Sequence, residues 1–226
     1  MDEVGILDDI PWPRASDSLL GARDDWQAIA CLDWARGDAV VRALGFQRAA
    51  EVLFQELARG RDQDLLVYPF AFCWRHHLEL ELKCLMRAAA GSLGRSLSKA
   101  AQDDMARYGL KQLWARCRPL LEEVDPRSTE DLGHAERLLL ELHEVDPSGE
   151  AFRYATTNAG DPTLAEISAS RIALDRFHRV CQALSNLFGG CAAQIDDWRS
   201  ATVGNRPAET NTPGNRDSPT HSLTSC

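Results

Sequence analysis

The hydrophobic positions of this chain recur mainly at the period of an α-helix. Between Asp38 and Gly60, the stretch VVRALGFQRAAEVLFQELARG places its apolar residues on one side at a spacing of 3.6 residues, which predicts a first core helix. The apolar stretch YPFAFCWRHHLELELKCLM, residues 68–86, predicts a second helix. Pro69 would occupy a permitted first-turn position, and Gly91 marks the expected end.

Two further helices are expected in the middle of the chain. A third helix, roughly residues 97–123, carries an apolar stripe, and Pro119 is expected to kink or split it. Ser128 with Asp131 forms an approximate capping box for a fourth helix, DLGHAERLLLELHEV, which the Asp-Pro pair at 146–147 terminates.

A fifth helix is predicted after the polar loop DPSGEAFRYATTNAGDP. Thr163 and Glu166 form a capping box at its start, and the pattern continues to about Trp198. Gly189 and Gly190 stand inside the pattern, so we expect a break there.

The two ends of the chain lack this periodicity. Residues 1–23 predict an irregular lead-in, a helical domain is expected over residues 24–199, and the polar segment 200–226 predicts a disordered tail. Asp24 or Asp25 would cap the first helical segment, whose face consists of Trp26, Ile29, Ala30, Asp33 and Trp34 and is interrupted by Gly37. No segment alternates with the period of a β-strand, so the predicted class is all-α, with about five helices.

Composition limits the classes of protein to consider. With 226 residues and 44% hydrophobic content, the chain can bury the core of one ordinary domain. The N-terminus is acidic where a secretory signal would be basic, and no apolar run approaches the roughly 18 residues of a membrane span. The seven cysteines are odd in number and mostly lie inside helical patterns, which favours reduced thiols. We therefore expect a cytoplasmic protein without membrane contact.

The net charge of -9 argues against binding nucleic acid through a global positive field. One local cluster departs from this balance, because residues 95–118 contain six bases and two acids. A solvated helix face is the favoured interpretation of this cluster, and a local binding patch is the alternative.

The predicted second helix carries charges inside an apolar stretch. On a helical wheel with 100° per residue, its apolar residues form two roughly opposite arcs, which consist of Trp74, Leu78, Leu82 and Leu85 on one side and Cys73, Leu80 and Cys84 on the other. A surface helix needs one apolar stripe, so this helix is expected to be central, with at least one polar arc enclosed. Glu79 lies four residues from both Arg75 and Lys83 and can pair with either. A surface run of ion pairs, a buried cluster that lines a groove and a catalytic site all remain open.

Three stretches together resemble a family of bacterial HEPN-like helical proteins. YPFAFCWRHHLELELK is similar to the family's second-helix signature, through Tyr68, Pro69, Arg75, His76, Glu79, Leu80, Leu82 and Lys83. GLKQLWARCRPLLEEV resembles its short helix with a Leu-x-x-Leu-Trp core. HEVDPSGEAFRY resembles a third segment, through His143, Glu144, Asp146, Pro147, Phe152, Arg153 and Tyr154. The stretches occur in the family's order over about residues 38–190.

This resemblance implies a HEPN-like bundle and a setting in toxin-antitoxin or phage-defence systems. Members of the wider group include metal-independent ribonucleases with an Arg-x(4–6)-His motif and proteins that bind without cutting. A homodimer and an antitoxin-like protein partner are further implications. One position departs from the family, because Tyr108 stands where a His often precedes the Leu-x-x-Leu-Trp helix. A phenol can donate a hydrogen bond but is a poor base near neutral pH.

The Arg-His motif carries little information here. Four pairs have suitable spacing, namely Arg127 with His134, Arg137 with His143, Arg171 with His178 and Arg216 with His221. Random placement of the arginines and histidines would give about two such pairs. Arg137 with His143 stands out, because His143 also belongs to the HEVDP segment, although a histidine at a helix end also interacts favourably with the helix dipole.

Other chemistries have weaker support. Cys73, His76 and His77 could supply half of a metal site, but no second cluster has zinc-like spacing, so neither a metal nor a cofactor is expected. Phosphate-binding glycine loops and nucleophile elbows are absent from the sequence. Four tryptophans at helical spacing are expected in the core rather than stacked on bases, and they are Trp26, Trp34, Trp74 and Trp114.

The leading hypothesis is a binding or regulatory protein with a polar groove for RNA or a nucleotide. The expected groove residues are Arg75, His76, Glu79, Lys83, Tyr108, Asp146, Arg153 and Tyr154. Glu79 would pair with Arg153 or Lys83 and orient the bases toward a phosphate.

Two alternatives compete with this hypothesis. An active endoribonuclease would use His143 or His76 as acid and base, and Arg75, Arg137 or Arg153 as the group that stabilises the anion. A purely structural network in a protein-interaction module is the other alternative. Solvent access distinguishes them, because a site needs Arg75 and His143 open to a common cleft, whereas a structural network needs them dry.

Overall fold

A computed structural model describes residues 37–107, 109–164 and 171–204, together with positions 12–13, 15–16, 18–19, 27 and 29–32. The chain forms two compact units, Met1–Asp38 and Ala39–Cys226, and the helices belong to the second. Several positions discussed above lie outside the described residues, namely Asp24, Asp25, Trp26, Asp33, Trp34, Tyr108, Glu166, Arg216, His221 and the tail beyond Gly204. Ile29 to Leu32 are not helical.

The described part of the chain is all-helical, which confirms the predicted class. Its α-helices are α1 (Ala39–Ala58), α2 (Gln63–Ser92), α3 (Lys99–Ala106), α4 (Leu110–Val124), α5 (Thr129–Val145) and α6 (Leu174–Gly204), with a 3-10 turn, η2 (Pro126–Ser128), before α5. One isolated β-bridge, Thr156 to Pro162, closes the loop between α5 and α6, and the described residues form no strand.

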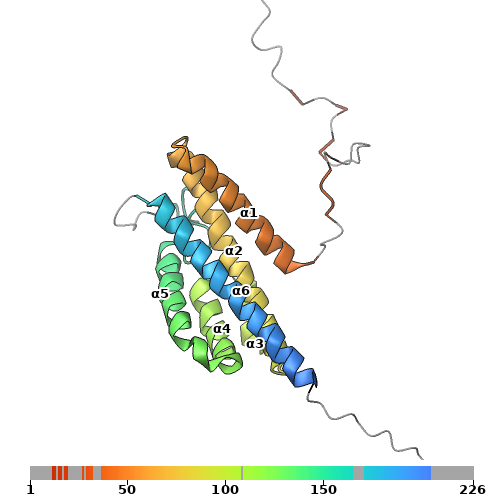
Figure 1. Cartoon of the computed structure of the whole chain (residues 1–226). Coiled ribbons are helices and arrows are strands. Elements are labelled where there is room, and N and C mark those ends of the chain that lie inside the picture. Colours follow the sequence, from red (N-terminus) through yellow and green to blue (C-terminus); the bar gives the residue numbers. More distant parts are fainter. Residues whose placement is uncertain are drawn as a thin grey trace, which may run out of the picture. The chain divides into compact units, whose positions relative to one another are not determined.

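Helix α2 is the central element, as its two apolar arcs predicted. It packs against α1, α6 and α4, while α5 lies against α4 (Figure 1). The first arc is fully covered, because Trp74, Leu78 and Leu82 have no exposed surface, whereas Leu80 and Cys84 of the second arc are half-buried. Trp114 on α4 is buried too, so two of the four tryptophans are core residues, as expected.

Pro69 does not lie in the first turn of α2, contrary to the prediction. The helix begins at Gln63, so Pro69 falls in its second turn. Pro69 cannot donate a hydrogen bond to the carbonyl of Leu65, four residues earlier. Leu65 is exposed at 69%, so the position lies at the open end of the helix, where the loss is tolerated.

The predicted third helix is divided, but at Arg107 to Gly109 rather than at Pro119. Ser98 caps α3 by accepting a hydrogen bond from the amide of Ala101, and Gly109 occupies the N-cap position of α4. Pro119 lies inside α4 without ending it. A glycine and an extended residue at the boundary therefore have more effect than the proline.

The capping predictions for the last two helices were partly wrong. Ser128 occupies the N-cap of α5 but makes no side-chain capping bond, and Asp125 instead accepts the amide of Arg127 in η2. Thr163 caps none of the described helices, and its hydroxyl donates to the carbonyls of Ala151 and Tyr154.

Helix α6 differs from its prediction at both ends and in the middle. It begins at Leu174 and continues to Gly204, beyond the expected end at Trp198. Gly189 and Gly190 lie within it without a break. Both glycines are exposed, and a Cβ atom would meet nothing within 4 Å at either, so their effect is a lower helix propensity rather than a bend.

Candidate functional site

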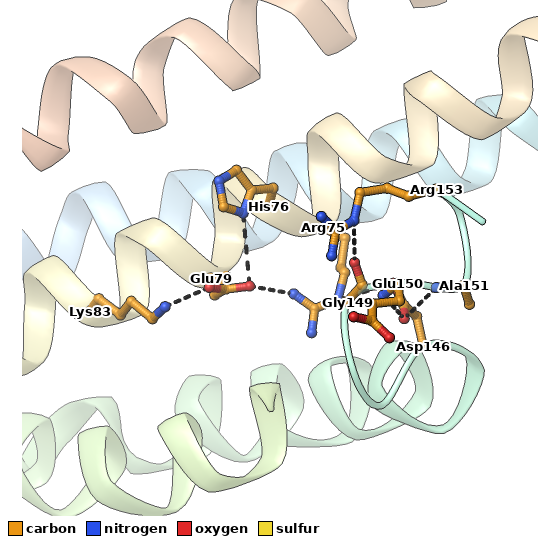
Figure 2. Close-up of polar contacts among 9 residues, drawn as sticks. All are labelled: Arg75, His76, Glu79, Lys83, Asp146, Gly149, Glu150, Ala151 and Arg153. Carbon is orange, nitrogen blue, oxygen red and sulfur yellow. Dashed lines mark hydrogen bonds and ion pairs between the residues drawn. The ribbon is translucent and has the colours of Figure 1, made fainter. Parts of the chain in front are cut away.

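A buried ionic network joins α2 to the end of α5. Arg75, Glu79 and Asp146 expose 1%, 1% and 0% of their side chains. Arg75 Nη1 donates to Glu79 Oε2 at 2.7 Å, and Arg75 Nε lies 3.2 Å from Asp146 Oδ2, close enough for an ion pair but poorly aligned for a hydrogen bond (Figure 2). Dry charges require partners of this kind, because an uncompensated buried ion costs several kcal/mol.

Asp146 extends this network into the loop that follows α5. Its Oδ1 accepts hydrogen bonds from the backbone amides of Glu150 at 2.8 Å and Ala151 at 3.0 Å. Gly149 supplies the positive φ of 76° that the turn requires. The loop after α5 is therefore fixed to the central helix through one carboxylate that contacts both.

Glu79 carries the negative charge of the network at neutral pH. Burial alone would raise its pKa, but the His76 ring at 3.8 Å, the hydrogen bond from Lys83 and the charges of Lys83 and Arg75 together lower that pKa to about 2. Lys83 Nζ lies 2.5 Å from Glu79 Oε1, which is one of the two pairings predicted. Arg153, the other predicted partner, instead donates from Nε to the carbonyl of Gly149 at 2.9 Å.

An aromatic and basic array covers this network on the outside. The Arg153 guanidinium lies 5.4 Å from the ring centre of Phe72 and 5.2 Å from that of Tyr154. Phe72 also stacks on His76, with 5.6 Å between the ring centres and an interplanar angle of 9°. We call these four residues, Tyr154, Arg153, Phe72 and His76, the ladder.

The ladder is accessible where the network beneath it is not. Tyr154 is 55% exposed, Arg153 is exposed, and His76 exposes 23% of its side chain. Tyr68, 48% exposed, continues the same face of α2 one turn earlier. The sequence reasoning did not single out Phe72, although the four-residue spacing of Tyr68, Phe72 and His76 was the available signal.

The structure does not bring Arg137 and His143 together. Six residues apart on α5, they point in directions about 120° apart. Arg137 is exposed, with Nη1 3.7 Å from Glu141 Oε2. His143 faces the interior, where burial, followed by the positive charges of Arg75 and Lys111, lowers its pKa below the ordinary value. Its Nδ1 is buried and has no hydrogen-bond partner among the described residues.

His77 is a second buried polar residue, and it ties three helices together. Its Nδ1 lies 2.9 Å from the carbonyl oxygen of Ala43 on α1, and its Nε2 lies 2.9 Å from Ser185 Oγ on α6. Glu81 Oε2 is 3.0 Å from the same Nε2. With no exposed surface, His77 is a structural residue rather than a member of an accessible site.

The basic cluster between residues 95 and 118 is largely neutralised by neighbouring acids. Arg95 forms two hydrogen bonds to Glu123, and the other pairs are Lys99 with Asp103, Arg116 with Asp104, and Arg118 with Glu122 and Glu136. This arrangement agrees with the favoured interpretation of a solvated helix face.

Neither a group of metal ligands nor a membrane-spanning helix is found among the residues that the structure describes. Among them, no three His, Cys, Asp or Glu side chains are grouped as metal ligands would be. None of the helices described there combines the length and apolar character needed to cross a bilayer.

Comparison of the chain with protein-family models, with curated proteins and with solved structures gives no match. The site must therefore be interpreted from its own geometry. That geometry divides the predicted site residues into a dry network, Arg75, Glu79 and Asp146, and an accessible part formed by His76, Arg153 and Tyr154 with Lys83 beside them.

Proposed function

We propose that this protein binds a single-stranded, phosphate-bearing ligand, with RNA as the leading candidate, across the ladder, and that it does not cut this ligand. The observation that carries the proposal is the position of Arg153 between the rings of Phe72 and Tyr154. Alternating rings and cations are what single strands require, because bases stack on the rings while the cations contact phosphates.

The buried network supports this proposal by holding the ladder in place. Arg153 lies in the loop that Asp146 fixes to Arg75, and its own Nε is held by the Gly149 carbonyl. A side chain that is already ordered loses less entropy on binding, so the network contributes to affinity without touching the ligand.

Overall charge limits how strong this binding can be. The chain carries a net charge of -9, so long-range attraction for a polyanion is absent and the local cations Lys83 and Arg153 must suffice. Two phosphate contacts correspond to a slope of about -1.4 in a plot of log affinity against log salt concentration. We therefore expect modest affinity that is most easily measured at low salt.

Burial of Arg75 favours binding over catalysis. A ribonuclease needs a guanidinium that reaches the reacting phosphate, and the Arg75 side chain is 1% exposed and already paired with two carboxylates. Arg137 and His143 point in different directions, so they offer no replacement pair. The HEPN-like family, the defence or toxin-antitoxin setting, the antitoxin-like partner and a homodimer rest on the sequence resemblance and belong to this proposal.

The direct test is fluorescence anisotropy with a labelled single-stranded oligoribonucleotide at 50 mM salt. Arg153→Gln and Tyr154→Ala should each weaken binding by about 5- to 100-fold, the effect expected from losing one stacking or cationic contact. Arg176→Gln is the matched control, because Arg176 is exposed on α6 outside the ladder. Absence of binding by the unmodified protein, or an equal loss in the control, would overturn the proposal.

A second arm addresses the catalytic alternative. The unmodified protein, His143→Ala and Arg75→Ala are incubated with single-stranded and structured RNA in excess EDTA. Intact RNA in all samples agrees with binding alone. Cleavage that survives EDTA and disappears in either variant would instead establish a metal-independent ribonuclease.

A further inference from the structure

A cavity of about 860 Å³ opens beside the ladder. Its walls come from the first two turns of α2, the loop after α5 and the start of α6, and they include Tyr68, Phe152, Arg153, Tyr154, Arg171 and Leu174. This volume lies in the range of pockets that take small organic molecules, about 300 to 1,000 Å³.

The cavity combines apolar walls with positive charge. Val67, Phe152, Ile172 and Leu174 contribute apolar surface from three separate segments. Arg171 is exposed and forms no ion pair or hydrogen bond within the part of the chain that the structure describes. A wall of this kind favours a ligand with an apolar body and a polar head.

The charged groups around the cavity favour an anionic head. Two guanidiniums, Arg153 and Arg171, line it, and among the described lining residues Asp64 supplies the one carboxylate. The N-terminal turns of α2 and α6 also form its walls, so the positive ends of two helix dipoles lie beside it. Asp64 offsets part of this positive potential from within the first turn of α2.

We propose that this cavity is a binding site for a small organic anion that has an aromatic or apolar body and a phosphate or carboxylate head. The head lies between Arg153 and Arg171, and the body lies against Val67, Phe152 and Ile172. Guanidiniums suit such heads, because their planar donors match the oxygens of carboxylates and phosphates.

This site goes beyond the proposed nucleic-acid binding and does not depend on it. Arg153 and Tyr154 belong to both the cavity and the ladder, but Arg171 and the apolar wall belong to the cavity alone. A test with probes that contain no nucleotide, and with a change at Arg171, therefore separates the two proposals.

The test is isothermal titration of the full chain with phenyl phosphate, inorganic phosphate and benzyl alcohol. Phenyl phosphate has both the body and the head, and a ligand of this size is expected to bind with a Kd of about 0.1 to 1 mM. Inorganic phosphate lacks the body and benzyl alcohol lacks the charge, so each should bind at least about tenfold more weakly.

Variants then locate the site. Arg171→Gln should weaken phenyl phosphate binding about tenfold, whereas Asp64→Asn should strengthen it by removing the opposing charge. Val67→Ser should reduce the preference for phenyl phosphate over inorganic phosphate. Arg176→Gln, outside the cavity on the same helix as Leu174, should leave the affinity unchanged.

Three results would overturn this inference. The first is that 5 mM phenyl phosphate, about five times the weakest expected Kd, gives no heat of binding. The second is that phenyl phosphate and inorganic phosphate bind equally well. The third is that Arg171→Gln binds phenyl phosphate as tightly as the unmodified protein does. Arg171 is exposed, so its substitution should leave the fold intact, and an unchanged circular dichroism spectrum and Tm verify this. Oligoribonucleotide affinity measured on the same variant should be unchanged, because Arg171 lies outside the ladder.

Discussion

The most direct test of the buried network is the substitution Glu79→Gln. Glutamine has nearly the same shape as glutamate but no charge, so Arg75 and Lys83 lose the carboxylate that they share. Asp146 still faces Arg75, so one of its two ion pairs survives. We expect a folded but less stable protein, whose loss of stability depends on pH.

The magnitude follows from the pKa of Glu79. Lowering this pKa from the ordinary value of 4.5 to about 2 means that the folded chain binds a proton less readily than the unfolded chain. Ionisation of Glu79 then contributes about 3 kcal/mol to the free energy of unfolding at pH 7. This contribution is complete above the unfolded pKa and is lost as pH falls toward about 2, with about 2 kcal/mol gone by pH 3.

Urea unfolding of the unmodified protein and of Glu79→Gln, at intervals between pH 7 and pH 3, measures this effect. The two free energies of unfolding should approach each other by about 2 kcal/mol over that range. Glu141→Gln is the matched control, since Glu141 is 72% exposed and 3.7 Å from its partner. Parallel stability curves for the unmodified protein and Glu79→Gln would refute the assignment of a low pKa to the buried network.

Three further outcomes are expected. His77→Ala should lower the free energy of unfolding by about 2 to 4 kcal/mol, because it leaves Ser185 and a carbonyl of α1 buried without their partner, and urea unfolding measures this loss. Burial lowers the pKa of His178 below 6.5, so the unfolded chain takes up a proton more readily than the folded chain, and the free energy of unfolding should fall as pH drops below 6.5. His178→Phe should reduce this pH dependence of the free energy of unfolding between pH 6.5 and 5. Burial raises the pKa of Cys117 and Cys181, so both thiols should resist a thiol reagent in the native protein and react on unfolding.

The central position of α2 was predictable because local spacing alone defines it. Two opposite apolar arcs cannot both be covered on a surface helix, and the helix indeed packs against three others. The pairs of Glu79 with Arg75 and Lys83 followed from the same i,i+4 geometry. The ion pair between Arg75 and Asp146 joins residues far apart in sequence, so the i,i+4 spacing could not predict it.

Helix boundaries were less predictable, because weak signals compete there. Pro119 predicted a break in α4, yet the break falls between α3 and α4, where Arg107 and Gly109 have extended backbones. Thr163 and Glu166 formed a plausible capping box, yet Thr163 donates its hydroxyl to loop carbonyls instead. A side-chain oxygen that can cap a helix can also close a turn, and only the folded loop decides between these uses.

The ladder and the cavity illustrate the limit of sequence reasoning for function. Arg153 and Tyr154 were expected near the site, but the contact of Arg153 with Phe72 depends on how the loop after α5 folds back on α2. Arg171 was considered only as half of an Arg-His pair with His178. In the structure it lines the cavity, whereas the half-buried His178 stacks on Phe54 at 3.9 Å.

The buried charges of the central helix link it to the loop after α5, because Arg75 pairs with both Glu79 and Asp146. Burying Arg75 and Glu79 has a desolvation cost that an apolar pair of the same volume would avoid, so stability alone does not account for them. An apolar pair would leave Asp146, and with it the loop that carries Arg153, without a directional link to α2. If the network exists to position that loop, Asp146→Asn should disturb ligand binding at Arg153 more than Glu79→Gln does. Asparagine retains an oxygen for the two loop amides but cannot form the ion pair with Arg75.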